Sequence, residues 1–332
     1  WTVTVADTSA PVAVCQDITV QLDEDGLAMI TTEDLDGGST DDCPSGPGPG
    51  GLASLILSET DFDCADIGTN SVTLTVEDIG GNTDTCIAEV IVEDNVLPTA
   101  VCQDITIQLD ADGLGSILPG DIDGGSSDAC GIASLNADTT MFSCDDVGEN
   151  IVLLSIEDSN GNLDTCTATV TVSDTINPLA LCRNVTVQLD ADGTGSISTA
   201  MINNGSSDEC GIADLEVDVQ DFDCDDIGDN LVNLTVTDNA GNTATCKAAV
   251  TVADTVAPAL LCQDAIVMLN ANGQGVLEVA DVDAGTNDAC GLDTLYTDQA
   301  TFGCADVGAN IVTLTAVDDN GNSNSCASTV TV

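Results

Sequence analysis

Short runs of alternating apolar and polar residues fill most of the chain. Apolar side chains occupy every second position from Ile105 to Leu109, and again from Val152 to Ile156. Such alternation is typical of β-strands with one buried face. Asp-Gly and Asn-Gly pairs lie between the runs and indicate tight turns. No segment of useful length has a helical period, so the sequence predicts an all-β fold.

The cysteines divide the chain into four similar segments. In the last three, consecutive cysteines are 28, 14 and 22 residues apart, and the pattern returns every 80 residues. The first segment carries an insertion in the Pro/Gly-rich residues 44–51. A fixed period of this size marks tandem domains. We therefore predict a final strand of a preceding repeat at 1–6 and four repeats at 7–93, 94–173, 174–253 and 254–332.

One phenylalanine recurs at the same place in each repeat, and we interpret it as a core residue because burying Phe contributes about 1.5–3 kcal/mol. These residues are Phe62, Phe142, Phe222 and Phe302.

Charge and cysteine content narrow the setting. The chain has 58 acidic residues, two basic residues, no His and 16 Cys. A protein surface with this much negative charge repels nucleic acid and anionic lipid. Many Cys without CxxC pairs or His predict disulfides and an oxidising compartment rather than zinc. No apolar stretch is long enough for a membrane helix.

The repeated motifs resemble a known family. The DAC-G motif, the strand ending in D-x-x-GN, the cysteine of the last strand and the D-x-x-x-P linker resemble hyalin-type (HYR) repeats. The 80-residue form with QLDADG is similar to arrays in giant cell-surface adhesins of Bacteroidota, including SprB-type gliding adhesins exported by the type IX system. The resemblance implies a tandem array of four immunoglobulin-like β-sandwich repeats, and we expect the natural protein to continue beyond both ends.

In a sandwich of this kind the first and last strands run side by side and parallel. That arrangement predicts bridges between the first and fourth cysteine of each repeat, namely Cys15–Cys86, Cys102–Cys166, Cys182–Cys246 and Cys262–Cys326. The two remaining cysteines would then pair locally, as Cys43–Cys64, Cys130–Cys144, Cys210–Cys224 and Cys290–Cys304. Each repeat is thus expected to hold two disulfides.

Aspartates recur in three segments that strand directions bring to one end of each repeat. They are Asp7, Asp94, Asp174 and Asp254 in the linkers, Asp42, Asp128, Asp208 and Asp288 in the loop before the second cysteine, and Asp78, Asp158, Asp238 and Asp318 in the last turn. Ca²⁺ takes six to eight oxygen ligands and would bridge such carboxylates. The alternative is that they are turn formers on a solvated surface.

Two other interpretations of the acids are weaker. The LDADG segments, with Asp110 and Asp112, share acids with EF-hand loops but not the full ligand pattern, so we interpret them as hairpin turns. A glycosidase acid pair is disfavoured because the same acids recur in every repeat and aromatic residues for a sugar cleft are missing. We therefore expect no enzyme.

The predicted function is a structural stalk or filament segment of a large extracellular cell-surface adhesin, stiffened by Ca²⁺ between repeats. Strands of this length predict a rod of roughly 120–160 Å. The expected partners are neighbouring repeats of the same longer chain, with surface polysaccharide or a cell-surface anchor as further candidates, without nucleic acid or membrane insertion. The alternatives are that the repeats themselves bind polysaccharide or a partner surface, or that they polymerise into a fibre. Uniform repeats favour the stalk, and Tyr296 is the aromatic residue that would test this for repeat 4.

Overall fold

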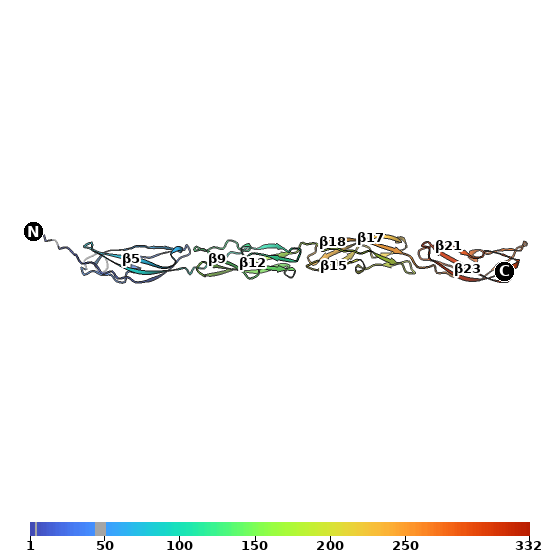
Figure 1. Ribbon diagram of the computed structural model, residues 1–332, viewed down its shortest axis with the longest axis horizontal. Coiled ribbons are helices and arrows are strands. Elements are labelled where there is room, and N and C mark those ends of the chain that lie inside the picture. Colours follow the sequence, from blue (N-terminus) through green and yellow to red (C-terminus); the bar gives the residue numbers. More distant parts are fainter. Residues whose placement is uncertain (4, 44–50) are drawn as a thin grey trace. The chain divides into compact units, whose positions relative to one another are not determined.

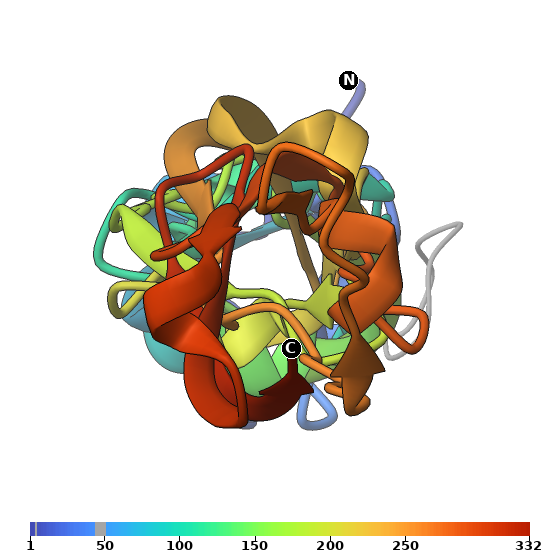
Figure 2. The ribbon, with the colours of Figure 1, turned by 90° about the vertical axis from the view of Figure 1, so that its right-hand side faces the viewer.

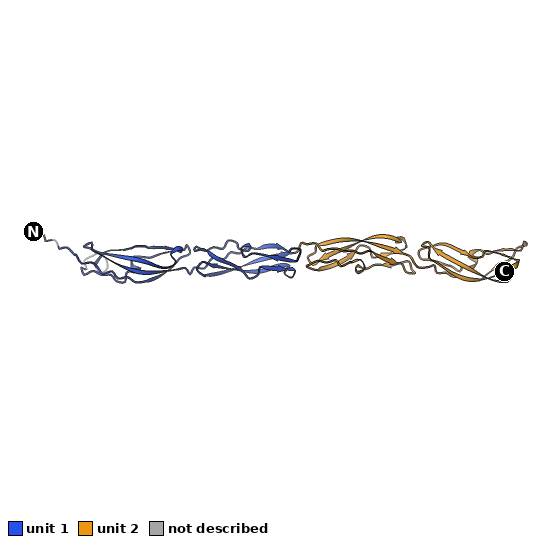
Figure 3. Ribbon diagram, in the orientation of Figure 1, with its two compact units in different colours: residues 1–173 blue, residues 174–332 orange. Residues whose placement is uncertain are grey.

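The computed structural model describes residues 1–3, 5–43 and 51–332. They divide into two compact units, Trp1–Ser173 and Asp174–Val332 (Figure 3). All of the predicted insertion except Gly51 lies outside the described residues. The described residues among 1–6 form no strand, and the limits of the individual repeats stay predictions.

Each repeat is built from a four-stranded sheet and a two-stranded sheet, which confirms the predicted all-β sandwich class (Figure 1). In unit 1, the first repeat has β1 (Ile18–Gln21), β2 (Leu27–Met29), α1 (Thr32–Leu35), β3 (Leu52–Leu57), β4 (Asp61–Asp63), η2 (Cys64–Asp66), β5 (Gly68–Asp78) and β6 (Thr83–Glu93). The second has β7 (Ile105–Gln108), β8 (Leu114–Ser116), η3 (Pro119–Asp121), β9 (Ile132–Ala137), β10 (Met141–Ser143), η4 (Cys144–Asp146), β11 (Gly148–Asp158) and β12 (Leu163–Ser173).

Unit 2 repeats the same order. Its first repeat has β13 (Val185–Gln188), β14 (Gly195–Ser196), α2 (Thr199–Ile202), β15 (Ile212–Val217), β16 (Asp221–Phe222), η5 (Cys224–Asp226), β17 (Gly228–Asp238) and β18 (Thr243–Ala253). Its second has β19 (Ala265–Ile266), β20 (Gln274–Val276), α3 (Val279–Val282), β21 (Leu292–Thr297), β22 (Thr301–Gly303), η6 (Cys304–Asp306), β23 (Ala309–Asp318) and β24 (Ser323–Thr331). Residues 254–332 are orange to red in Figure 2.

Strand order explains how the two ends of each repeat meet. In the second repeat the large sheet has the order β7-β12-β11-β9, and β8 pairs with β10 in the small sheet. The first strand runs parallel to the last, with Ile105 opposite Val170, as the sequence predicted. The remaining neighbours in this sheet are antiparallel.

The core lies between the two sheets of each repeat. Along β11, Val152, Leu154 and Ile156 are fully buried while the alternate residues face outward. Phe142 packs inside, and its equivalents Phe62, Phe222 and Phe302 are also buried, which confirms their predicted role. Within the described residues, no helix combines the length and apolar character needed to cross a bilayer.

Two local details differ from expectation. A single helical turn follows the second strand of each repeat, as in α1 and α2, and is too short to produce a sequence period. The LDADG segment forms a tight turn in which Asp110 Oδ1 accepts from the N–H groups of Asp112 and Leu114. That turn joins β7 to β8, which lie in different sheets, so the hairpin interpretation is wrong.

Candidate functional site: the inter-repeat junction

One disulfide joins the first and last strands inside each repeat. These bridges are Cys15–Cys86, Cys102–Cys166, Cys182–Cys246 and Cys262–Cys326. They are the four outer pairs expected from the parallel neighbours in the sheet. In the second repeat the bridge closes a segment of 64 residues, which the chain-entropy model values at about 4 kcal/mol.

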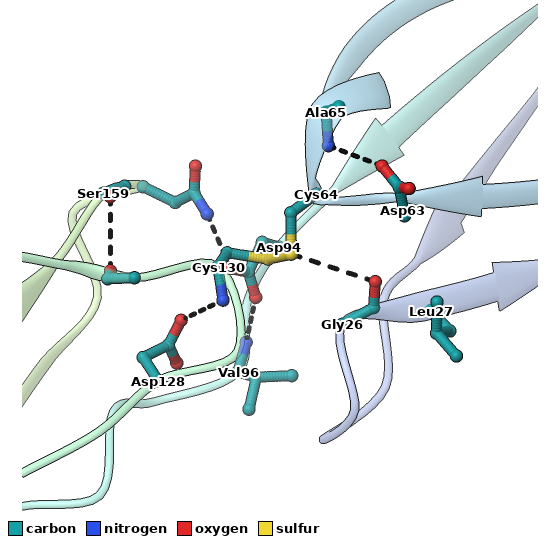
Figure 4. The surroundings of a disulfide bond; sticks show 12 residues. Gly26, Leu27, Asp63, Cys64, Ala65, Asp94, Val96, Asp128, Cys130 and Ser159 are labelled. Carbon is teal, nitrogen blue, oxygen red and sulfur yellow. Dashed lines mark hydrogen bonds between the residues drawn. A yellow bond between two sulfur atoms is a disulfide. The ribbon is translucent and has the colours of Figure 1, made fainter.

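The other bridges join neighbouring repeats instead of closing loops within one repeat. Cys64 bonds to Cys130, and Cys224 bonds to Cys290 (Figure 4). Cys144 and Cys210 are disulfide-bonded as well. The four predicted local pairs, Cys43–Cys64, Cys130–Cys144, Cys210–Cys224 and Cys290–Cys304, are therefore wrong, and so is the expectation of two disulfides inside each repeat.

Strand geometry explains the error. Cys130 precedes β9 at the end of the sheet where Ile132 pairs with Asp158, whereas Cys144 precedes β11 at the opposite end. The 11 residues of β11 span about 36 Å at 3.3 Å per residue. A disulfide needs Cα atoms within about 7 Å. Although Cys130 and Cys144 are close in sequence, they lie at opposite ends of one repeat and are too far apart to form a disulfide.

Gly26 allows the two repeats of unit 1 to approach closely. The Cys64 sulfur atom lies 3.8 Å from the Gly26 carbonyl oxygen. A Cβ atom on Gly26 would lie 2.8 Å from Cys64 Sγ and 3.0 Å from Ala129 Cβ of the next repeat. Gly193 has the same surroundings in unit 2, with Cys224 and Ala289. The glycine that ends the D-x-D-G turn, Gly26 or Gly193, is thus part of the junction.

The linker is held by the last turn of the repeat that it enters. Asn162 Nδ2 donates to the Asp94 carbonyl oxygen at 3.1 Å and to Asp158 Oδ2 at 2.7 Å. Asp158 Oδ1 also accepts from the N–H groups of Asn160 and Asn162. Both carboxylate oxygens of Asp158 therefore serve the turn.

The same turn recurs around Asp78, Asp238 and Asp318, whose carboxylates accept from Asn82, Asn242 and Asn322. Hydrogen bonds from Asn82 lower the pKa of the Asp78 carboxyl. Burial alone would raise the pKa of Asp158, but the Asn162 amide and the turn N–H groups outweigh burial and lower it. The main role of these four aspartates is therefore to hold the last turn together.

The linker and loop aspartates do come together, as expected. Potential ligand atoms lie within 4.8 Å of one another in the groups that contain Asp94 with Asp128, Asp174 with Asp208, Asp254 with Asp288, and Asp7 with Asp42. Asp41 joins the last group and was missed by the sequence interpretation. Its signal was the adjacent acid pair before Cys43.

In repeat 3, grouping the carboxylates makes it harder to keep Asp208 ionised. The pKa of Asp208 is raised by burial and by the carboxylates of Asp174, Asp238 and Glu209, although the Cys210 N–H bond opposes this. The sulfur atoms of Cys130, Cys210 and Cys290 lie in these groups but are oxidised in disulfides, so they are not thiolate ligands. The donors that remain are carboxylate oxygens, which suit hard cations such as Ca²⁺.

Two cysteines of the described chain, Cys43 and Cys304, are free and exposed. The adjacent Asp7 carboxylate favours the protonated thiol of Cys43 and repels its thiolate, which raises the pKa of Cys43 to about 11. Cys304 Sγ lies 3.9 Å from the Gly273 carbonyl oxygen, in the position that Cys64 and Cys224 occupy beside Gly26 and Gly193.

Comparison with known proteins agrees with this architecture. Residues 253–332 match the HYR domain family. Hyalin from Strongylocentrotus purpuratus is 26% identical over 349 residues, which cover 100% of this chain and 28% of hyalin. The chain thus spans less than a third of that relative. These matches support HYR-type immunoglobulin-like repeats in an extracellular, adhesion-type region.

Solved structures of other repeat proteins also align with the chain. Extracellular cadherin domains 1–5 of protocadherin gamma B2 are 13% identical, with 98% of this chain and 81% of that chain covered and a TM-score of 0.32. Immunoglobulin domains 1–5 of Sidekick-1 are 10% identical, with 96% and 79% covered and a TM-score of 0.32.

Proposed function

We propose that the chain is a structural stalk segment of a larger extracellular adhesin. The observation that carries this proposal is the bond between neighbouring repeats, Cys64–Cys130 in unit 1 and Cys224–Cys290 in unit 2. A row of independent binding modules needs only linkers, whereas a covalent bond beside the linker restricts how two neighbours can rotate. The match to hyalin and the disulfides, which persist in oxidising compartments, support an extracellular setting.

Ca²⁺ bound by the grouped linker and loop aspartates is part of this proposal, as a second restraint on the junction. Its support is the approach of these carboxylates to within 4.8 Å of each other. Membership of the giant Bacteroidota adhesins, with type IX export and a role in gliding, is supported by the motif resemblance and stays a prediction.

Small-angle X-ray scattering of the whole chain tests the stalk. We expect a sharply defined maximum dimension of roughly 120–160 Å for the oxidised protein, and a broader distribution after the Cys64→Ser and Cys224→Ser substitutions together. A broad distribution in the oxidised protein would contradict the stalk. Stiffening of the chain by Ca²⁺ is tested separately by repeating the measurement with about 2 mM Ca²⁺ and with excess chelator. This concentration exceeds the dissociation constants typical of extracellular Ca²⁺-binding modules.

Side-by-side association is a second candidate, favoured by one specific observation. Ile151, Leu231 and Ile311 occupy the same outward position of β11, β17 and β23, and each is more than two-thirds exposed. If the repeats form a fibre or bind a partner surface, these side chains offer the contact. Sedimentation velocity over a range of concentrations, with all three residues changed to Thr, tests whether the chain self-associates through them.

A further inference from the structure

The four linker aspartates share one hydrogen bond and differ in a second. In every repeat, Oδ1 accepts at 3.0 Å from the N–H group two residues later, which belongs to Ser9, Val96, Ile176 and Val256. The other oxygen, Oδ2, depends on the residue in the middle of the last turn. That residue is Gly80, Asn160, Ala240 or Asn320.

In repeats 2 and 4 an asparagine satisfies Oδ2. Asn160 Nδ2 donates to Asp94 Oδ2 at 2.6 Å, and Asn320 Nδ2 donates to Asp254 Oδ2 at 3.0 Å. Gly80 and Ala240 have no amide to offer. Within the described part of the chain, Asp7 Oδ2 and Asp174 Oδ2 are buried and have no hydrogen-bond partner.

Asp174 is the sharper of these two cases, because the whole side chain is only 8% exposed. Its carboxylate belongs to the same close group as Asp208, whose pKa is raised by burial and by Asp174 itself. A buried carboxylate oxygen normally has a partner. The chain has two basic residues, and Arg183 donates instead to the carbonyl groups of Ala200 and Met201.

We propose that Asp174 Oδ2 and the Asp208 carboxylate hold a divalent cation of the Ca²⁺ type in repeat 3, and that Asn160 and Asn320 replace this cation in repeats 2 and 4. Two oxygens on one Ca²⁺ lie no more than about 5 Å apart, because each Ca–O distance is about 2.3–2.6 Å. The observed grouping within 4.8 Å satisfies this limit. Backbone carbonyl oxygens and water supply the remaining ligands, since Ca²⁺ accepts both beside carboxylates.

This inference deepens the Ca²⁺ role proposed above and makes it selective. A uniform coat of surface acids would bind cations alike in every repeat. The proposal instead attributes the difference in Ca²⁺ binding between repeats to one residue of the last turn. This residue is Ala240 in repeat 3 and Asn160 or Asn320 in repeats 2 and 4. The amide and the cation are two solutions to the same problem, a buried oxygen that needs a positive partner.

Calorimetric titration of the full chain with CaCl₂ in 150 mM KCl, a salt concentration that screens diffuse surface binding, tests the proposal. Ala240→Asn installs the amide that repeats 2 and 4 already contain, so it should fold normally and weaken one Ca²⁺ equivalent at least about 10-fold. Asp174→Asn should have the same effect. Asn160→Ala frees Asp94 Oδ2 and should add one equivalent. Amide NMR shifts at Ile176 report whether the affected ion is bound at this site.

Equal Ca²⁺ binding by the wild-type chain and Ala240→Asn, with both folded by circular dichroism, would overturn the proposal. Failure of Asn160→Ala to gain an equivalent would overturn the claim that asparagine replaces the cation. Both outcomes leave the stalk untouched, because its test is the scattering profile. Conversely, a selective loss in Ala240→Asn with a scattering profile insensitive to chelator would retain the site and remove stiffening as its role.

Discussion

Cys64 and Cys130 belong to different repeats and are separated by 66 residues, yet their Cα atoms lie 5.3 Å apart and their sulfurs are bonded. Cys224 and Cys290 repeat the relationship in unit 2, with the same separation and a Cα–Cα distance of 5.2 Å. Two neighbouring repeats are therefore joined twice, once by the linker and once by sulfur.

The bond pattern itself can be checked by non-reducing peptide mapping. Protease digestion at acid pH, where thiol exchange is slow, should release linked peptides that contain Cys64 with Cys130 and Cys224 with Cys290. Recovery of a peptide linking Cys130 with Cys144, or Cys290 with Cys304, would contradict the inter-repeat pairing. The bridge Cys102–Cys166 serves as an internal positive control.

Gly193→Ala should loosen the junction of unit 2. The new Cβ would lie 2.8 Å from Cys224 Sγ and 3.1 Å from Ala289 Cβ, at a φ of +74°. Gly205→Ala is the matched control, because Gly205 has a φ of +82° but no atom within 4 Å of the place that a Cβ would take. The positive φ should cost both variants about 1–2 kcal/mol of unfolding free energy. Faster dithiothreitol reduction of Cys224–Cys290 is expected for Gly193→Ala alone.

Cys43 should react slowly with alkylating reagents near neutral pH. Its pKa of about 11 means that the thiolate, which is the nucleophile, becomes abundant only as the pH rises toward that value. Asp7→Asn removes the carboxylate that causes the shift, so alkylation at pH 8 should accelerate. Mass spectrometry of iodoacetamide labelling measures the rate, with Cys304 as a reference site. An unchanged rate in the variant would refute the role assigned to Asp7.

Asn162→Ala should destabilise repeat 2 by about 1–3 kcal/mol, because it leaves buried acceptors without a partner. Those acceptors are Asp158 Oδ2 and the Asp94 carbonyl oxygen. Asn136→Ala is the control, since Asn136 forms an exposed bond to Ser134. Urea unfolding monitored by circular dichroism measures the difference. A similar loss in both variants would show that the turn contact has no special weight.

The same contacts predict acid sensitivity. Because the pKa of Asp158 is lower in the folded protein, its stabilising contribution is present above the unfolded value of about 3.9 and is lost as the pH falls through the folded value. Unfolding midpoints should therefore decrease below about pH 4, and less steeply in Asn162→Ala. A parallel decrease in both proteins would argue against Asp158 as a source.

The strands could be predicted well from the sequence alone, for a physical reason. Alternation along residues such as Val152, Leu154 and Ile156 reports burial directly, and the parallel pairing of β7 with β12 follows once the sandwich is recognised. The outer bridges then follow from that pairing. Each of these features depends on one repeat considered by itself.

The junction could not be predicted in the same way. Whether Cys130 pairs with Cys144 or with Cys64 depends on the end of the sheet at which each lies, and spacing along the chain does not carry that information. The different surroundings of Asp94 and Asp174 depend on Asn160 and Ala240, which lie more than 60 residues away in sequence. Such contacts become visible only when the last turn is folded back onto the linker.

The disulfide loops overlap along each unit. In unit 1 the segment closed by Cys64–Cys130 overlaps the segments closed by Cys15–Cys86 and Cys102–Cys166, so every peptide bond from Cys15 to Cys166 lies inside at least one ring. Unit 2 has the same overlap from Cys182 to Cys326. A single protease cut anywhere in these stretches, including the linkers, would nick the backbone without releasing a fragment. The molecule would stay in one piece until a second cut or a reductant opened the ring.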